Sequence, residues 1–547
     1  MRRDASDSAP LATRRALLRG AAAAPLAASL PYDLALAQTA SGTLRVGMTL
    51  AAIPLSNGFP DQGGEGQRFM GITAYNFLCE FDLSRSDRAA PLKPGLATSW
   101  EIDPNNPKRW WFTLRQGVKF HDGKVFSAED VIFSLDRCFK RDAPWFDQRA
   151  NLQAGTRLPT VAGYGREGER IWIETIYPDS TLPFGLTYPG MVHQGAWEAA
   201  GRSWDRFMEK PVGTGPWKVE TWSIRERAVL VRNPDHWETA RIPRCERLVL
   251  LPLPDANTRV AALRSGQVDW IEAPPPDALA SLRAAGFQVV TNSYPHNWTW
   301  HFSMLEGSPW RDVRIRRAAN LAIDRKGMRA MLGDTMLEGA GLVTPDSPWY
   351  GTPSFKLTHD PAAARRLLAE AGFGPRNPVR TKMAISASGS GQMQPLPMNE
   401  LIQQNLKDVG IEVEYEVVEW NALLVIRREG APRAAQRGVT GVNISYGSAD
   451  PYNAFLRLLK ADLVPPKGGN FGHHADPELD AMMEQAFNTF DEEKRDAILA
   501  RIHTEIVDRA LFLFVGHDLN PRAMSRRVQG FVQARSWSQD LAPVSLR

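Results

Sequence analysis

Cysteine is scarce in this chain of 547 residues: only Cys79, Cys138 and Cys245 occur, and no two of them form a C-x-x-C pair. Three cysteines allow at most one internal disulfide, so we expect neither a disulfide-rich scaffold nor a cysteine-rich zinc site. We expect them to be buried as small hydrophobic side chains, although the sequence leaves open whether any pair is oxidised. Long apolar runs are also missing, because the longest, at Gly20–Tyr32, is interrupted by two prolines. It falls short of the roughly 18 residues of a spanning helix, which argues against an integral membrane protein.

Charge of one sign is also nearly absent. The formal net charge is +4, and the first 37 residues, with five arginines against three aspartates, account for half of it. A nearly neutral body gives no support for a nucleic-acid partner. The apolar fraction of 43% and the charged fraction of 23% are ordinary globular values. At this length we expect several domains or lobes.

Local signatures of common enzymes are missing too, since H-E-x-x-H, G-x-S-x-G, G-x-x-x-x-G-K-[ST] and G-x-G-x-x-G do not occur. His121-Asp122-Gly123 is typical of a turn. His473 and His474 could bind a metal, but adjacent residues of an extended segment point to opposite faces, so we expect them on a loop surface. We therefore predict no catalytic residue, no metal site and no cofactor.

The N-terminus has the order of an export signal. Thr13-Arg14-Arg15-Ala16-Leu17-Leu18-Arg19 precedes a weakly hydrophobic, alanine-rich stretch that ends in Ala35-Leu36-Ala37. Paired arginines, a short apolar region and an A-x-A site are typical of a twin-arginine signal peptide. We therefore expect residues 1–37 to be removed after export of the folded protein, and the mature chain to be free in the periplasm.

The mature chain reads as alternating strands and helices of α/β type. Helix starts are predicted at Ser127–Asp130, Asp360-Pro361 and Asp476-Pro477, and a helix near residues 398–409 ends at Gly410. The alternation of Ile411–Val417 predicts a strand with one buried face. Loops are expected at 274–276 and 386–397. Further strands are predicted at Leu44–Met48, Trp110–Leu114, Ile171–Tyr177, Ala228–Arg232, Leu248–Leu253 and Leu511–Val515.

The basic segment Arg311–Arg317 continues into apolar residues at helical spacing. It indicates an amphipathic helix with a solvated basic face, and contact with a protein partner is the alternative. Trp298, Trp300 and Trp310 are expected in the core or between lobes, although tryptophan also suits the wall of a ligand cleft.

Five stretches follow one another along the chain. The most specific of them begins Trp111-Phe112-Thr113-Leu114-Arg115-Gln116-Gly117-Val118 and runs to Val131. The others are Val212–Trp217, Arg259–Asp269, Asp312–Arg325 and Asp360–Gly372. Together, and in this order, they resemble the extracytoplasmic solute-binding proteins of ABC importers, in the peptide/nickel/opine family (family 5). The resemblance covers about residues 42–540.

The resemblance implies an α/β periplasmic binding protein of the Venus-flytrap type, with mixed sheets flanked by helices and two segments crossing between its lobes. It implies lobe I at 38–75, 186–290 and 515–547, an extra subdomain of lobe I at 76–185, and lobe II at 291–514. The implied function is capture of a peptide-like or other small polar solute, without bond chemistry, by a monomer that delivers it to the ABC permease and ATPase complex.

The resemblance also implies site residues. Trp420 would stack on the ligand, Arg427 would meet a carboxylate, and Tyr446 and Asp450 would line the cleft. Gly447 stands where peptide-binding members carry an aspartate that pairs with the α-amino group, so the resemblance implies a ligand other than an ordinary peptide, such as a modified peptide, an opine-like conjugate or a sugar-derived compound. The loop 50–59, with Leu55 and Asn57, is expected to form a further wall.

Two alternatives remain open at this point. One is an exported metal-dependent hydrolase that uses His473 or His474. The other is a binding protein that serves a chemoreceptor instead of a permease.

Overall fold

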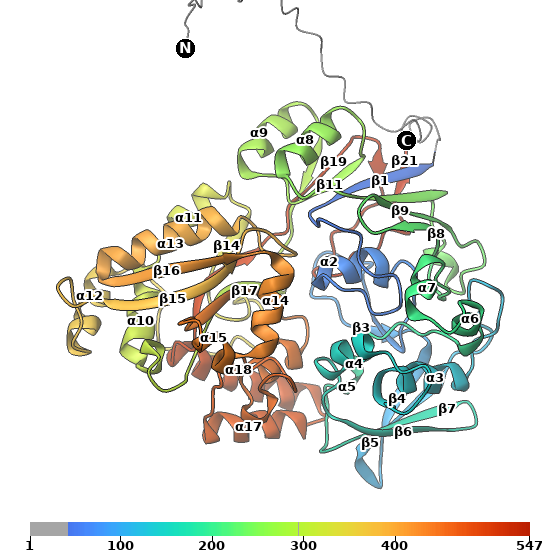
Figure 1. The fold of residues 1–547 in the computed structure, drawn as a ribbon, viewed down its shortest axis with the longest axis horizontal. Helices are drawn as coiled ribbons and strands as arrows, with labels where there is room; N and C mark the ends of the chain where they lie inside the picture. The colour runs from blue at the N-terminus through green and yellow to red at the C-terminus, as the bar shows by residue number, and fades with distance from the viewer. Residues whose placement is uncertain (1–41, 294) are drawn as a thin grey trace, which may run out of the picture. The chain divides into compact units, whose positions relative to one another are not determined.

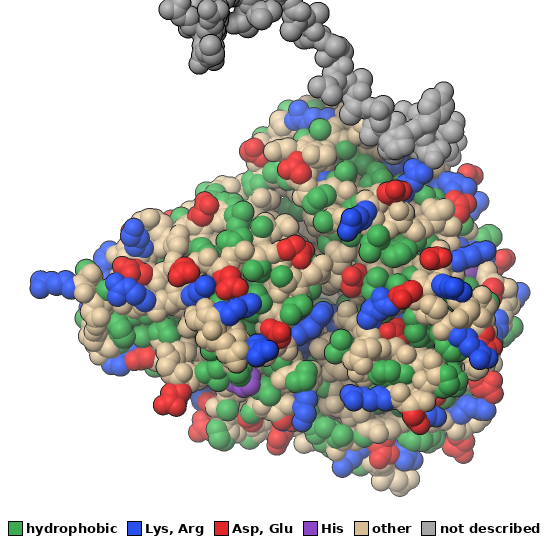
Figure 2. Space-filling model, viewed as in Figure 1, with side chains coloured by type: hydrophobic (Ala, Val, Ile, Leu, Met, Phe, Trp, Pro, Cys, Tyr) green, Lys and Arg blue, Asp and Glu red, His purple; other side chains and the backbone are tan. Residues whose placement is uncertain are grey.

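The computed structural model describes residues 42–293 and 295–547 (Figure 1). The expected signal peptide at residues 1–37 lies outside the described residues. Within the described ranges, no helix combines the length and the apolar character needed to cross a membrane. The face drawn in Figure 2 carries acidic and basic side chains interspersed, without a continuous basic field.

The larger sheet has seven strands, of which the central strand β1 (Thr43–Met48) is buried along its whole length. β1 pairs in parallel with β10 and β11, whereas β8, β9, β12 and β19 pair antiparallel to their neighbours, so the sheet is mixed. Its strands, in spatial order, are β12 (Gln288–Val290), β19 (Arg522–Met524), β11 (Trp270–Glu272), β1, β10 (Arg247–Pro252), β9 (Arg227–Arg232) and β8 (Trp217–Ser223). The helices α8 (Ala256–Arg264) and α9 (Pro276–Ala284) pack on it through Leu263 and Leu282.

The second large sheet has six strands and a core on each face. Along its strand β18, Phe512 and Phe514 join one core while Leu513 and Val515 join the other, because successive side chains of a strand point to opposite faces. The strands, in spatial order, are β14 (Met336–Glu338), β18 (Phe512–Asp518), β13 (His296–Phe302), β17 (Gly441–Gly447), β15 (Val379–Ser386) and β16 (Ile411–Val418).

The helices of this half divide between its two cores. The first core takes residues of α14 (Trp420–Glu429), α17 (Pro477–Phe487) and α18 (Glu492–Asp508). The second takes residues of α10 (Val313–Ala322), α12 (Pro361–Glu370) and α13 (Pro395–Val409). The shorter helices of this half are α11 (Arg325–Met331), α15 (Ala431–Ala435) and α16 (Arg457–Leu459).

A four-stranded antiparallel sheet with its own core lies in the region expected to form an extra subdomain. Its strands are β4 (Ala97–Asp103), β5 (Asn106–Leu114), β7 (Arg170–Thr175) and β6 (Val161–Glu167). It is accompanied by the short pair β2 (Cys79–Phe81) and β3 (Leu92–Pro94), and by α3 (Ala128–Phe139), α4 (Gln148–Gly155) and α5 (Leu182–Gly185). Along the chain, α2 (Gly63–Gly66) lies between β1 and β2, and α6 (Gln194–Ala199) and α7 (Trp204–Glu209) lie between α5 and β8. Near the C-terminus, β20 (Val528–Gln529) pairs with β21 (Ser545–Leu546).

The chain passes between the two large sheets twice, from β12 to β13 and from β18 to β19. We propose that the seven-stranded sheet is the core of lobe I, that the six-stranded sheet is the core of lobe II, and that the two passages form the hinge. The boundary expected between residues 514 and 515 falls inside β18. Because β18 pairs with β13 and β14 as far as Asp518, the passage lies at residues 519–521.

Most local predictions are confirmed. The helix start at Ser127 carries a capping box with Asp130, and α12 and α17 begin at the predicted Asp-Pro pairs. Gly410 ends α13 in the left-handed conformation with φ 104°, which glycine adopts without strain. The helix α13 starts at Pro395, slightly before the predicted end of the loop. All three cysteines are free and buried.

The solvated basic face predicted for Arg311–Arg317 is wrong for Arg316, which is buried. Its guanidinium donates to the carbonyl oxygens of Arg509, Ala510 and Trp310 at 2.9, 3.1 and 2.7 Å. The Arg509 and Ala510 carbonyls follow the C-terminus of α18, where carbonyls lack helical partners and attract a cation. The Trp310 carbonyl belongs to the short turn η3 (Pro309–Arg311), which precedes α10. The three tryptophans near this segment are fully buried, as predicted.

Candidate functional site

A cavity of about 580 Å³ is lined by residues from three parts of the structure. These are the segments beside the seven-stranded sheet, the segments beside the six-stranded sheet, and the subdomain. Five of the seven site residues predicted from the sequence line it: Trp420, Arg427, Tyr446, Gly447 and Asp450. The topology brings them together, because α14, the end of β17 and the segment after it meet at one edge of the six-stranded sheet.

Trp420 is the first residue of α14, whose N-terminus is capped by the Glu419 carboxylate. The indole is buried, and its Nε1 has no hydrogen-bond partner among the described residues. The loop after β15 lies on the ring: a β-carbon added to Gly389 would come within 2.5 Å of the indole, so only glycine permits this approach. The ring therefore has one face packed against a loop and an unused donor.

Arg427 lies two helical turns after Trp420 and so on the same side of α14. Its guanidinium lies 4.6 Å from the centre of the Tyr446 ring, within the range of a cation–π contact. Burial lowers the pKa of Arg427 to about 10, and the neighbouring guanidinium of Arg457 acts in the same direction. Arg427 therefore places a desolvated positive charge in the cavity wall.

Tyr446 and Gly447 are the last residues of β17, where Gly447 lies opposite His296 of β13. The Tyr446 hydroxyl has no hydrogen-bond partner in the described part of the chain, although the side chain is only 6% exposed. A buried hydroxyl without a hydrogen-bond partner destabilises the fold. A ligand that bonds to the Tyr446 hydroxyl would remove this cost. Gly447 presents no side chain at all to the cavity.

Asp450 precedes the turn η4 (Tyr452–Leu456) and accepts hydrogen bonds from the Asn453 backbone and amide nitrogens at 2.8 and 2.7 Å. Burial raises the pKa of the Asp450 carboxyl, and the charges of Arg157 and Arg457 only partly oppose this. Asp450 is thus a buried acid that faces basic groups without forming an ion pair with either within 4.0 Å.

Leu55 and Asn57 are not among the lining residues. The Leu55 N–H donates to Asp61 Oδ1 at 2.9 Å, and the Asn57 carbonyl accepts from the guanidinium of Arg137. Arg137 is itself held by a buried ion pair with Asp147 at 2.6 Å, so the subdomain draws this loop away from the cavity. The wall on this side comes instead from the following segment, through Gly63, Gly64 and Gln67.

Sequence reasoning missed Arg157, Arg457, Tyr188 and Trp537, which also line the cavity. Arg157 follows α4 in the subdomain and stacks on the Tyr188 ring at 3.5 Å. Arg457 begins α16 and is only 7% exposed. No local pattern marks these residues, because they come from separate segments spread between residues 157 and 537.

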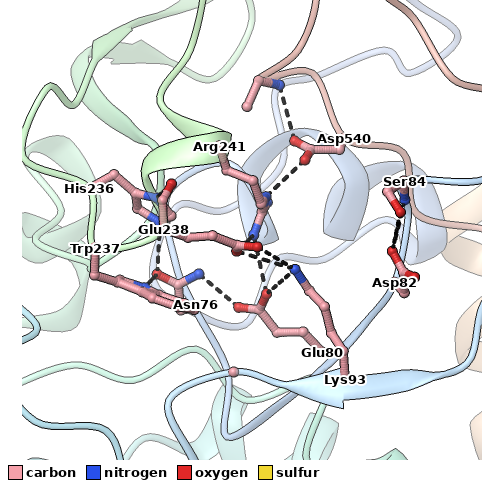
Figure 3. A network of polar contacts seen from close by, with 12 residues as sticks. Asn76, Glu80, Asp82, Ser84, Lys93, His236, Trp237, Glu238, Arg241 and Asp540 are labelled. Atoms are coloured by element: carbon pink, nitrogen blue, oxygen red, sulfur yellow. Dashed lines mark hydrogen bonds and ion pairs between the residues drawn. The ribbon is translucent and has the colours of Figure 1, made fainter. Parts of the chain in front are cut away.

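A polar network forms another part of the lining (Figure 3). Arg241 pairs with Glu80 at 3.1 Å and with Asp540 at 2.8 Å, while Lys93 pairs with Glu238 at 2.8 Å. These ion pairs tie the β2–β3 pair to the loop before β10 and to the C-terminal tail. Arg241 and Lys93 engage the carboxylates of Glu80, Glu238 and Asp540, so we expect this part of the wall to be rigid.

The structure also places the two histidines considered as metal ligands. His473 lies in a loop with a positive φ of 56°, and His474 is 8% exposed, so the expected surface position is wrong for His474. Its backbone is held on both sides by the Asn470 side chain. Among the described residues, no group of three or more His, Cys, Asp or Glu side chains is placed to hold a metal ion.

Comparisons with known proteins agree on one family. The family model described as "Bacterial extracellular solute-binding proteins, family 5 Middle" matches residues 91–462. The heme-binding protein A of Haemophilus influenzae is 27% identical over 487 residues, which cover 84% of this chain and 84% of that protein. The dipeptide-binding protein of Escherichia coli is 24% identical over 529 residues, which cover 90% of this chain and 96% of that protein.

A solved structure shows the same fold. The periplasmic binding protein DppA from Helicobacter pylori, in complex with the peptide STSA, superposes with a TM-score of 0.78 at 20% identity, and the match covers 94% of this chain and 99% of that one. This likeness confirms the expected α/β fold with mixed sheets and flanking helices.

Proposed function

Since this chain belongs to the bacterial extracellular solute-binding proteins of family 5, the non-enzymatic substrate-binding components of ABC importers, we propose that it captures a small polar solute in the 580 Å³ cavity without gripping a free α-amino group. The single observation that carries this proposal is the cavity itself. It is built from groups of both lobes, and Trp420, Arg427, Tyr446, Gly447 and Asp450 line it together.

Capture follows from the way the cavity is divided between the lobes. A ligand that contacts both lobes at once stabilises the closed form. Without the ligand, a smaller fraction of the protein is closed. A solute bound at micromolar affinity supplies about 8 kcal/mol in total, part of which drives closure. Within the described residues, the chain passes between the two large sheets twice, which suits a hinge motion.

The chemistry at Gly447 sets the ligand apart from an ordinary peptide. A protonated amine in a buried site needs an anion close by, or its desolvation is uncompensated. Gly447 offers no side chain, and Arg241 and Lys93 engage the carboxylates of Glu80, Glu238 and Asp540 (Figure 3). The buried Asp450 faces Arg157 and Arg457. A modified peptide, an opine-like conjugate or a sugar-derived compound fits this part of the cavity better than a peptide with a free α-amino group, because it needs no anion there.

The cellular context completes the proposal. Arg14-Arg15 and the Ala35-Leu36-Ala37 site support export of the folded protein to the periplasm by the twin-arginine route. The closed form would then be recognised by an ABC permease and its ATPase at the inner membrane, with the binding protein acting as a monomer.

Isothermal titration calorimetry of the mature protein tests this function. The ligands are dialanine, N-acetyl-dialanine, an opine, a nickel–histidine chelate and maltotriose, and small-angle X-ray scattering follows compaction. We expect saturable binding of at least one polar solute together with a smaller radius of gyration. Tight binding of dialanine with no preference for the acetylated form would overturn the argument from Gly447, and turnover of any ligand would overturn the function.

A further inference from the structure

Three arginines of the cavity have no carboxylate partner. Among the described residues, no ion pair within 4.0 Å involves Arg157, Arg427 or Arg457. The Nε atoms of all three are buried without a hydrogen-bond partner there. In the same part of the chain, the one side-chain hydrogen bond that these guanidinium groups make is from Arg457 Nη1 to Asn453 Oδ1, at 3.0 Å.

The three groups lie close enough to act together. The guanidinium carbons of Arg427 and Arg457 lie 4.6 and 5.9 Å from the centre of the same Tyr446 ring. A β-carbon built on Gly469 would lie 3.0 Å from Arg457 Nε and 3.1 Å from Arg427 Nη2. Burial lowers the pKa of the Arg157 guanidinium, and the positive charge of Arg457 lowers it further.

Other buried guanidinium groups of the described residues, Arg137 and Arg316 among them, have close partners. Arg137 pairs with Asp147, and Arg316 meets backbone carbonyls at helix ends. Transfer of an unpaired guanidinium out of water is costly, and mutual repulsion adds to the cost when three lie together. Asp450 is the acid that faces Arg157 and Arg457, and one carboxylate against three guanidinium groups leaves two positive charges in excess. Buried, unpaired charges of this kind are typical of functional sites, where a bound ligand compensates their desolvation.

On the premise of the proposed function, we infer that Arg157, Arg427 and Arg457 form a subsite for a ligand group with two negative charges, either a phosphoryl group or a pair of carboxylates. Arginine presents its donors in a planar fork that matches both kinds of oxyanion. The Tyr446 ring lies beside two of the arginines, and its unused hydroxyl can supply a further donor.

The three arginines come from opposite sides of the cavity, so an anion bound to all of them would also favour closure. Arg427 and Arg457 belong to lobe II, on α14 and α16, whereas Arg157 follows α4 in the subdomain. An anion held by all three joins the two sides of the cavity. In its absence the like charges of the two sides repel each other. The ligand's anionic end therefore favours the closed form directly.

Titration with simple anions tests the subsite without the natural ligand. Sulfate represents a phosphoryl group, malonate represents paired carboxylates, and acetate is the singly charged control, all at one ionic strength set with sodium chloride. We expect sulfate or malonate to raise the melting temperature of the mature protein and to bind at least about 10-fold more tightly than acetate. Whichever of the two binds more tightly identifies the source of the charge.

Matched variants locate the effect. We expect R157Q, R427Q and R457Q each to weaken dianion binding by about 10-fold or more, since each removes charge-assisted hydrogen bonds. R380Q, which removes an arginine that is 72% exposed on β15, serves as the control and should bind as the parent does. The comparison of dianions with acetate needs only the parent protein, so it stands even where a variant fails to fold.

The outcomes separate this inference from the function on which it rests. Equal weak effects of sulfate, malonate and acetate, or undiminished dianion binding by R157Q and R457Q, would overturn the subsite. A neutral solute that binds tightly and compacts the protein would do the same while leaving capture intact. Dianion binding that depends on the three arginines but never changes the radius of gyration would support the subsite and contradict capture by closure.

Discussion

The backbone N–H of Ser180 donates a hydrogen bond of 2.8 Å to the carbonyl oxygen of Phe487, and so joins the subdomain to the end of α17. The Ser180 hydroxyl adds a bond of 3.0 Å to the Ala486 carbonyl. Beside them the Phe490 ring meets Trp110 edge-on at 5.6 Å between centroids. This contact links the two sides of the cavity through residues that do not line it. We therefore expect it to stabilise the arrangement in which the two sides lie together, whatever the ligand is.

We expect Phe490→Ala to shift the ligand-free protein toward the open form. An edge-to-face aromatic pair is worth about 0.5–1.5 kcal/mol, so its loss should reduce the closed population and the apparent sulfate affinity by roughly 2- to 10-fold. Small-angle X-ray scattering should report a larger radius of gyration, and calorimetry should report the weaker affinity.

Phe139→Ala is the matched control for this contact. Phe139 meets Tyr164 at 6.2 Å within the subdomain, so its removal should lower the melting temperature without changing the radius of gyration or the sulfate affinity. Equal scattering curves for Phe490→Ala and the parent would contradict a role of this contact in closure.

Gly447→Asp should create affinity for free-amine peptides. A β-carbon at position 447 would lie 3.4 Å from the Trp537 ring and 3.8 Å from the Pro295 carbonyl, so the backbone has room for a side chain. The new carboxylate would pair with an α-ammonium group, which is worth about 10- to 100-fold in affinity. Calorimetry with dialanine should detect binding by the variant, and Gly447→Asn and N-acetyl-dialanine serve as uncharged controls. If the parent binds dialanine as tightly as the variant does, the glycine is not what excludes such peptides.

Asp450→Asn should strengthen the binding of sulfate, because it removes the acid that faces Arg157 and Arg457. Burial raises the pKa of Asp450, so the parent protein loses this negative charge at a higher pH than a free aspartate would. Sulfate stays doubly charged throughout, and its affinity for the parent should therefore rise as the pH falls from 8 to 4.5. The variant should show a flatter profile, and parallel profiles for both proteins would argue against Asp450 as the source.

Local elements could be predicted from the sequence because their causes lie within a few residues. Ser127 and Asp130 cap α3 reciprocally, and the left-handed Gly410 ends α13. Trp420 and Arg427 could be placed on one side of a helix from their spacing alone. The resemblance to a family added the clustering of these residues with Asp450.

Long-range contacts could not be predicted in this way. The buried position of Arg316 depends on carbonyls near residue 510, almost two hundred residues away. Asn57 is turned away by Arg137 of the subdomain, an interaction that no pattern around Asn57 reveals. Arg157 reaches the cavity only because the subdomain folds against lobe II, where the Tyr452 hydroxyl donates to the Thr156 carbonyl at 3.2 Å. The parts of the site that were missed are those which tertiary packing alone brings together.

Glu65 provides a test of stability against pH. Its carboxylate accepts from the Thr49 N–H at 2.8 Å and from the Thr49 hydroxyl. The Glu65 backbone N–H donates to the Ser390 hydroxyl oxygen at 3.1 Å. Burial raises the pKa of Glu65 above its ordinary 4.5, and the nearby charge of Glu272 adds to this, while Arg68 opposes it. The folded protein therefore binds this proton more tightly than the unfolded chain does.

It follows that the contribution of Glu65 to stability is fully present below about pH 4.5 and is lost as the pH rises through the folded-state pKa. Glu65→Gln mimics the protonated form, and the amide can still bond to Thr49. We expect the variant to be more stable than the parent at pH 7.5, by an amount of the order of 1 kcal/mol, and the difference to vanish near pH 4.

Urea unfolding across this pH range measures the difference in the free energy of unfolding between the two proteins. Glu129→Gln, which removes a carboxylate that is 74% exposed, should leave the curve unchanged. A Glu65→Gln protein less stable than the parent at pH 7.5 would mean that Glu65 is ionised in the fold and stabilised by Arg68.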